Sequence, residues 1–152
     1  MGRGRGVIRH LLAAVVAALL LAMPGAAVAG PNVTLGDWRV EPSTVKENQP
    51  WTVKLWVANL GNEPVKKPFS VEVRECDKEM TKCDKVWAST VVKPEGDDLK
   101  PGKLPGKLVI IEIKQGLAKG DHYLQLVVDV KKEVQEKPYT RRITVPVGFW
   151  KQ

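Results

Sequence analysis

Cysteine and histidine are both scarce in this sequence, and neither occurs in a pattern that supports chemistry. The 152 residues include two cysteines and two histidines. No CxxC motif, no histidine pair at metal-site spacing and no glycine-rich phosphate loop occurs. An enzyme needs a positioned nucleophile, a base or a metal ion. We therefore expect a protein that is not an enzyme, with no catalytic residue, no cofactor and no metal ion.

A clustered basic stripe, which nucleic-acid binding would require, is also lacking. The formal net charge of the whole chain is +7. Residues 1–29 hold three arginines and no carboxylate, so their removal would lower that charge to +4. The remaining lysines are scattered singly or in pairs such as Lys66-Lys67, with acidic residues nearby. The sequence therefore argues against nucleic acid as a partner.

Long hydrophobic runs are absent except near the N-terminus. Arg3, Arg5 and Arg9 precede the apolar run Leu11–Ala22, and the small residues of Ala27–Ala29 follow it. This order is typical of a secretory signal peptide, which we expect to form a helix and to be cleaved after Ala29. Retention as a membrane anchor is the alternative. We expect an exported chain, periplasmic or extracellular, with no transmembrane segment in its mature part.

The rest of the chain has the pattern of strands, and its clearest stretch begins at Trp51. Trp51, Val53, Leu55 and Val57 alternate with more polar positions, which predicts a strand with one buried face. Asn59-Leu60-Gly61-Asn62 ends it, and Asn and Gly tolerate the positive φ of a tight reversal. We expect this strand to lie at the centre of the core.

Six further strands are predicted, and no amphipathic helix is visible after the signal segment. A slip in the alternation at Gly36-Asp37 indicates a bulge in the first strand. The run Leu108–Ile113 is almost continuously apolar, as in a strand buried on both faces. Residues 93–107 hold three prolines and three glycines, which suits a crossover between sheets. The predicted strands are Val33–Val40, Trp51–Ala58, Phe69–Arg74, Lys85–Val92, Leu108–Ile113, His122–Val130 and one that contains Ile143, Val145 and Val147.

Seven short strands separated by turns predict an all-β fold, a two-sheet antiparallel β-sandwich of the immunoglobulin-like type. We divide the chain into a signal peptide (residues 1–29), one sandwich domain (30–148) and a short C-terminal tail (149–152). Pro146 lacks an N–H group, so the last strand is expected at a sheet edge or near its own end there.

The two cysteines of the chain lie close together in the segment ECDKEMTKC. In an oxidising compartment, Cys76 and Cys83 are expected to form a disulfide. The alternative is a copper(I) site made from Cys76, Met80 and Cys83, because thiolate and thioether ligands favour soft metals.

Two other groups have a plain and a functional interpretation. His122 shares the parity of Leu124 in its strand, so we expect a half-buried ring that hydrogen-bonds to backbone at a corner of the sandwich. A metal ligand beside the cysteine segment is the alternative. Glu95, Asp97 and Asp98 could contribute to a calcium site, although acids in such a loop are usually solvated.

The tryptophans are the most informative candidates for binding, since five occur in the chain and all follow the signal segment. Trp56 points away from the core by the parity of its strand, Trp87 lies on a strand of uncertain orientation, and Phe149-Trp150 follows the last strand. Exposed aromatic side chains are enriched at binding surfaces. The alternative is that Trp56 packs under residues 93–107 and Trp150 folds back over the sheet.

Several short motifs resemble those of the CARDB family, the cell-adhesion-related domain found in bacteria, which has an immunoglobulin-like fold. They occur in the family's order across residues 31–147. The sequence departs from the family where His122 stands in place of a common tyrosine, and in Lys137–Arg142, where an Asn-rich end is usual. The matching pieces are Val40–Ser43, Val57–Gly61, Leu99–Gly102, Gly120–His122 and Leu126–Asp129.

The resemblance implies extracellular interaction or spacer roles without a reaction. We therefore expect an exported, non-catalytic binding, adhesion or structural module. It would act through aromatic surface residues or an exposed sheet edge on an envelope or extracellular protein or glycan, or on a second copy of itself. A periplasmic copper carrier is the alternative function.

Overall fold

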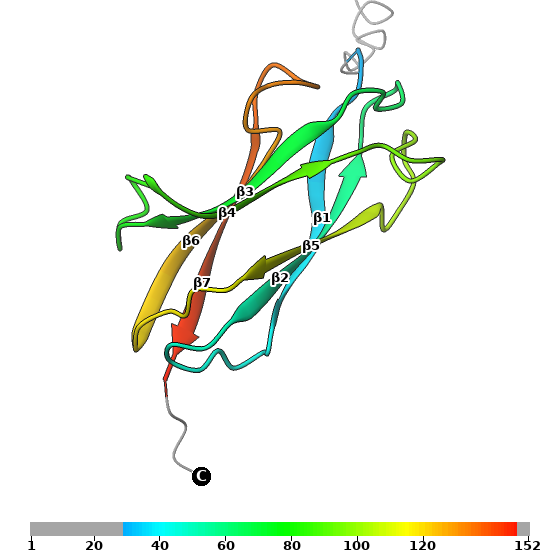
Figure 1. Ribbon diagram of the computed structural model, residues 1–152. Coiled ribbons are helices and arrows are strands. Elements are labelled where there is room, and N and C mark those ends of the chain that lie inside the picture. Colours follow the sequence, from blue (N-terminus) through cyan, green and yellow to red (C-terminus); the bar gives the residue numbers. More distant parts are fainter. Residues whose placement is uncertain (1–28, 149–152) are drawn as a thin grey trace, which may run out of the picture.

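The computed structural model describes residues 29–148, which fold into two β-sheets that face each other (Figure 1). The expected signal peptide and the tail that holds Phe149 and Trp150 lie outside the described residues. No helix within residues 29–148 is long and apolar enough to cross a membrane. The strands are β1 (Val33–Glu41), β2 (Trp51–Asn59), β3 (Phe69–Cys76), β4 (Lys85–Val92), β5 (Lys107–Ile113), β6 (Gly120–Val128) and β7 (Tyr139–Val147).

All hydrogen-bonded strand neighbours run antiparallel. One sheet has the order β1-β2-β5 and the other has the order β4-β3-β6-β7. The predicted seven-stranded sandwich is therefore confirmed, with β2 at the centre of its sheet as expected. The four edge strands are β1, β5, β4 and β7, so Pro146 lies in an edge strand, as the sequence predicted.

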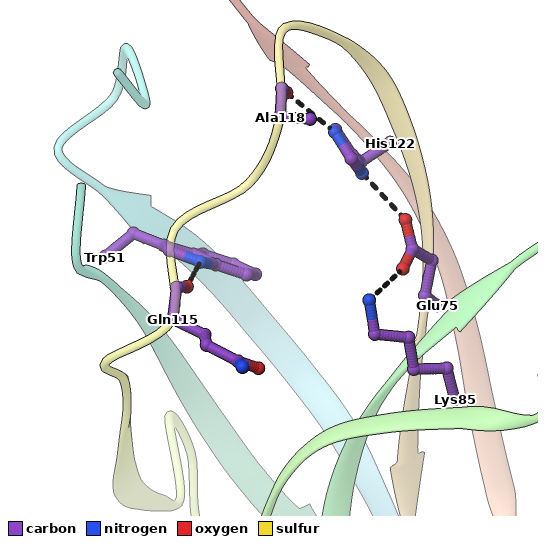
Figure 2. A network of polar contacts seen from close by, with 6 residues as sticks. All are labelled: Trp51, Glu75, Lys85, Gln115, Ala118 and His122. Carbon is purple, nitrogen blue, oxygen red and sulfur yellow. Dashed lines mark hydrogen bonds and ion pairs between the residues drawn. The ribbon is translucent and has the colours of Figure 1, made fainter. Parts of the chain in front are cut away.

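The core forms between the two sheets from alternate residues of each strand. Trp51 is 2% exposed, and its indole Nε1 donates to the carbonyl of Gln115 at 3.3 Å (Figure 2). A buried indole N–H needs such an acceptor. The predicted inward residues of β2, β3 and β7 are all buried, among them Leu55, Phe69 and Val145. In β6, Leu124, Leu126 and Val128 are buried as predicted, whereas Val130 lies beyond the strand and is half-buried.

The bulge predicted in β1 is present. The pairing of β1 with β2 shifts register between Leu35 and Asp37, so Gly36 is the extra residue. A side chain at Gly36 would meet the carbonyl oxygens of Trp56 and Pro105 at 3.3 and 3.4 Å. The bulge thus lies where the segment before β5 approaches β2 closely.

The loop after β2 does not use the positive φ that the sequence suggested for Asn59 and Gly61. A Cβ on Gly61 would lie 2.1 Å from the carbonyl oxygen of Gly30. Glycine is required here because the N-terminal segment passes directly over it, and no positive φ is involved.

The expectation that β5 is a buried strand is wrong for one of its faces. Val109, Ile111 and Ile113 are buried, whereas Leu108 and Ile110 are 44% and 53% exposed. An almost continuous apolar run does not reveal which face of a strand is covered, because the residues on both faces are apolar. The β5 strand pairs only with β2, and its outer face has no covering layer among the described residues.

Residues 93–107 connect β4 of one sheet to β5 of the other, which confirms the predicted crossover. Leu99 anchors this segment, since it is 3% exposed and its carbonyl accepts from the backbone N–H of Val65 and the side chain of Asn59. The crossover is therefore fixed to the end of β2.

Candidate interaction surface

The outer face of the three-stranded sheet carries Trp56, the first of the predicted binding residues. Trp56 lies on the central strand, opposite Asp37 of β1 and Leu108 of β5. Its side chain is half-buried, and the Arg39 guanidinium carbon lies over its ring at 5.4 Å from the centroid. Such cation–π contacts hold an aromatic ring in one orientation on a sheet surface.

Apolar side chains continue from Trp56 toward the edge of the sheet. Leu108 is its direct cross-strand partner, and Ile110 follows on the same face of β5. We call Trp56, Leu108, Ile110 and Arg39 the Trp56 surface. Trp56 and Leu108 are directly opposed and so lie about 5 Å apart at Cβ. In the neighbouring row of the same face, Lys54 lies between Arg39 and Ile110.

Charged residues lie within and around the Trp56 surface. The ammonium group of Lys54 lies 2.6 Å from a carboxylate oxygen of Glu41, and Arg39 contacts Asp37 more loosely at 4.0 Å. These pairs are largely exposed, so they contribute little to stability. The outer face of this sheet therefore combines exposed apolar and charged side chains.

Trp87, the second predicted binding residue, lies elsewhere. It is on β4 of the opposite sheet, half-buried and packed against the core, with the Lys85 ammonium 3.7 Å from its ring centroid. Its indole nitrogen is buried without a hydrogen-bond partner in the described residues. The fold does not bring Trp56 and Trp87 together, and Phe149 and Trp150 lie outside the described residues.

His122 belongs to a chain of polar contacts near one end of the four-stranded sheet (Figure 2). Its Nδ1 lies 2.8 Å from a carboxylate oxygen of Glu75, and its Nε2 lies 2.8 Å from the carbonyl of Ala118. Lys85 completes the chain, 3.1 Å from the second oxygen of Glu75. The expected backbone-bonded histidine is confirmed. Both ring nitrogens lie against oxygen atoms of the protein, so neither is open to a metal ion or a substrate.

The Glu75 carboxylate is held in its ionised form by this chain. Partial burial raises its pKa, but hydrogen bonds to His122 and Lys85 outweigh that effect, so the pKa lies below its ordinary value of 4.5. Ionised Glu75 therefore stabilises the fold above pH 4.5, and this contribution is lost as the pH falls through the folded-state pKa.

Glu75→Gln is expected to lower the free energy of unfolding at neutral pH by about 1 kcal/mol, because a partly exposed charged hydrogen bond is lost. The difference between variant and parent should shrink as the pH falls below 4.5. Urea unfolding at several pH values measures it, with the exposed Glu79→Gln as a control. A difference that grows in acid would contradict the assignment.

The predicted disulfide is confirmed, since Cys76 at the end of β3 is bonded to Cys83. Asp77 organises the enclosed loop, because its carboxylate accepts from the backbone N–H and the hydroxyl of Thr81 at 2.7 and 2.6 Å. The residues that the structure describes include no free cysteine. With both sulfurs in a disulfide there is no thiolate to bind copper, and the copper-carrier alternative has no support.

The acidic loop between β4 and β5 does not converge on one point. Lys107 contacts Glu95 and Asp98 at 3.6 and 3.5 Å, while Lys100 contacts Asp97 at 2.7 Å. Within residues 29–148, no group of three or more His, Cys, Asp or Glu side chains could hold a metal ion. The calcium interpretation of this loop therefore finds no support in the geometry.

Comparison with solved structures decides the fold. The CARDB domain of the PF1109 protein of Pyrococcus furiosus matches with a TM-score of 0.52 and 18% sequence identity, over 78% of this chain and 90% of that domain. This chain has the fold of a CARDB domain. That structure is described as a complex with di-metal ions, for which the described residues here offer no equivalent cluster. The resemblance inferred from the short motifs is thus confirmed at the level of fold.

The other comparisons are weaker. Two β-glucosidases, from Erythrobacter marinus and Listeria innocua, match with TM-scores of 0.44 and 0.45 and 15% and 14% identity. The matches span 76% and 79% of this chain but 15% and 16% of the respective enzymes. No protein-family model and no curated protein matches the sequence.

Sequence reasoning missed three of the four members of the Trp56 surface. Leu108 and Ile110 were assigned to the core, although Glu112 shares their parity and is exposed. That single charged residue was the signal that one face of the run meets solvent. Arg39 was missed because its position opposite Lys54, beside Trp56, depends on how the bulged β1 pairs with β2.

Proposed function

We propose that this chain is an exported, non-catalytic interaction domain that binds an envelope or extracellular protein through the Trp56 surface. The observation that carries the proposal is the uncovered patch of Trp56, Leu108 and Ile110 on a sheet whose opposite face is fully used by the core. Monomeric proteins seldom leave such contiguous apolar residues exposed without a use.

Export is supported by two independent features. The N-terminal residues have the order of a secretory signal, and the Cys76–Cys83 disulfide is typical of proteins that fold in an oxidising compartment. The periplasm and the cell exterior both provide that environment.

A protein partner suits this patch better than a glycan. Leu108 and Ile110 are exposed hydrocarbon side chains on the same face as the indole of Trp56, and a protein partner can bury such apolar area. Trp56 with Arg39 over it has the composition of an interface centre, since tryptophan and arginine are enriched among the residues that dominate binding.

Trp56→Ala is expected to weaken partner binding at least tenfold while lowering the free energy of unfolding by only about 1 kcal/mol, because the indole is half-buried on an outer face. Crosslinking in the native host, followed by recovery of the tagged chain, measures the binding. Thermal unfolding of the purified variants measures the stability.

The matched control is Val91→Ala, which removes an apolar side chain that is 61% exposed on the opposite sheet. It should leave recovery unchanged, and Trp56→Phe should restore part of it. Equal recovery with Trp56→Ala, or recovery of glycan without protein, would reject this assignment of the surface.

A further inference from the structure

The edge of the three-stranded sheet at β5 has an unused side. The register of β5 against β2 runs without a shift from Trp51–Ile113 to Val57–Lys107. On its other side β5 has no hydrogen-bonded strand among the described residues. Residues in a strand direct their N–H and C=O groups to alternate sides, so part of the β5 backbone faces outward and can accept a further strand.

The other three edges carry features that discourage pairing with a further strand. The edge at β1 has the bulge at Gly36 and the exposed charges Asp37, Arg39 and Glu41. These are known protections of sheet edges.

The edges of the four-stranded sheet are protected in similar ways. The pairing of β4 with β3 shifts register near Trp87, and β4 begins with the exposed Lys85. The β7 edge holds Pro146 and two exposed arginines, Arg141 and Arg142. Proline lacks the donor that an added strand needs, and arginine side chains oppose close approach of a like edge.

The β5 edge has none of these protections. It contains no proline and no bulge, and Leu108 and Ile110 are exposed on the outer face while Val109, Ile111 and Ile113 line the inner face. Its one exposed carboxylate, Glu112, lies near the end of the strand. An apolar, unshifted edge strand is the type that pairs with another strand.

We propose that two copies of this chain pair antiparallel through β5 and join their three-stranded sheets into one six-stranded sheet. A second copy is the occupant that fits, because antiparallel pairing of a strand with itself is two-fold symmetric. With the axis at Ile110, Ile110 meets Ile110 and Val109 meets Ile111 of the second copy, while Leu108 meets its Glu112. Near a two-fold axis at Ile110, the central residue of β5, the two Glu112 carboxylates fall on opposite sides of the centre. Like charges are thereby kept apart.

The pairing would place both Trp56 surfaces on the same side of the joined sheet, because a two-fold axis perpendicular to a sheet keeps each outer face outward. Exposed Leu108 and Ile110 of both copies then lie between the two indoles. Two linked patches would bind a partner with two sites more tightly than one patch. That gain in affinity rests on the proposed function, whereas the pairing itself does not.

Sedimentation equilibrium of the recovered chain, expressed at full length in a secreting host, tests the pairing over about 1 to 100 µM. A monomer–dimer equilibrium is expected, and Ile110→Lys should weaken it at least tenfold by placing two ammonium groups at the centre of the pair. Val91→Lys, the same change at an exposed edge position of β4, should leave the equilibrium unchanged. A monomer throughout, or equal dimerisation of the two variants, would overturn the proposal.

Hydrogen exchange separates strand pairing from contact between faces. In the dimer, β5 amides that do not bond to β2 should become protected as concentration rises, whereas stacking of two outer faces would leave them unchanged and would overturn the proposal. Ile110→Cys provides a second measurement, because both native cysteines are in the disulfide. A short bismaleimide should link two copies of Ile110→Cys but not two copies of Val91→Cys. If the parent chain dimerises but recovers no partner, the proposed function fails while the pairing stands.

Discussion

Asp129→Ala is expected to lower the free energy of unfolding by about 4 kcal/mol, since it removes the buried acceptor of three half-buried backbone N–H groups at once. Asp129 is wholly buried directly after β6. One of its carboxylate oxygens accepts from the N–H of Glu133 at 2.7 Å, and the other accepts from Val134 and Gln135 at 3.1 and 2.8 Å. Urea unfolding followed by tryptophan fluorescence measures the loss.

The loop that Asp129 organises connects β6 to β7 within the four-stranded sheet (Figure 1) and hydrogen-bonds to the start of β1 in the other sheet. Gln135 in this loop accepts from the N–H of Val33 at 2.7 Å and donates to its carbonyl at 3.1 Å. Glu133 accepts from the backbone and hydroxyl of Ser70 at 3.1 and 3.0 Å. Loss of the carboxylate would therefore release contacts on β1 and β3 together.

Asp129→Asn is the matched control. Asparagine keeps one acceptor oxygen and tolerates the positive φ of 60° at this position, which alanine does not favour. Asp129→Asn should lower the free energy of unfolding by about half as much as Asp129→Ala does. An alanine variant as stable as the asparagine variant would show that the loop N–H groups find water instead.

Asn59→Asp is expected to lower the free energy of unfolding by about 3 kcal/mol. Asn59 is wholly buried, and its amide uses both ends. The nitrogen donates to the carbonyls of Glu63 and Leu99 at 2.7 and 3.0 Å, while the oxygen accepts from the N–H of Asn32 and Gly61 at 2.9 and 3.0 Å. A carboxylate would turn the two donated bonds into contacts between acceptors.

The same variant offers an internal check by pH. A protonated aspartic acid regains one donor, so the deficit relative to the parent protein should shrink as the pH falls. Asn59→Ala loses all four hydrogen bonds without adding a titrating group. The difference in its free energy of unfolding from the parent protein should therefore not change with pH. A constant deficit in Asn59→Asp would contradict the role assigned to the amide nitrogen.

Asn59 also links the fold to the candidate surface. Its bond to Leu99 fixes the crossover that leads into β5, and its bond to Asn32 fixes the segment that leads into β1. Both neighbours of Trp56 on the outer face come from these two strands. Disruption of Asn59 is therefore expected to disturb the position of the Trp56 surface as well as stability.

The sequence by itself determined the strands, the inward residues of β2 and the bulge at Gly36. Each depends on local features, namely alternation with a period of two and its interruption. The disulfide followed from the spacing and scarcity of the cysteines in a chain that the sequence predicts to be exported. The CARDB-type fold followed from the order of its short motifs, and comparison with a solved structure bears it out.

Only the tertiary structure decided which strands are edges and what the buried polar groups bind. Leu108 and Ile110 were predicted in the core because both faces of β5 are apolar. Their exposure depends on the absence of a covering layer on the outer face of the three-stranded sheet among the described residues. In the sequence, Asp129 only marks the end of a strand. Its role as a hydrogen-bond acceptor depends on a loop that folds back over it. Strand pairing and loop closure join residues distant in sequence, so no local period encodes them.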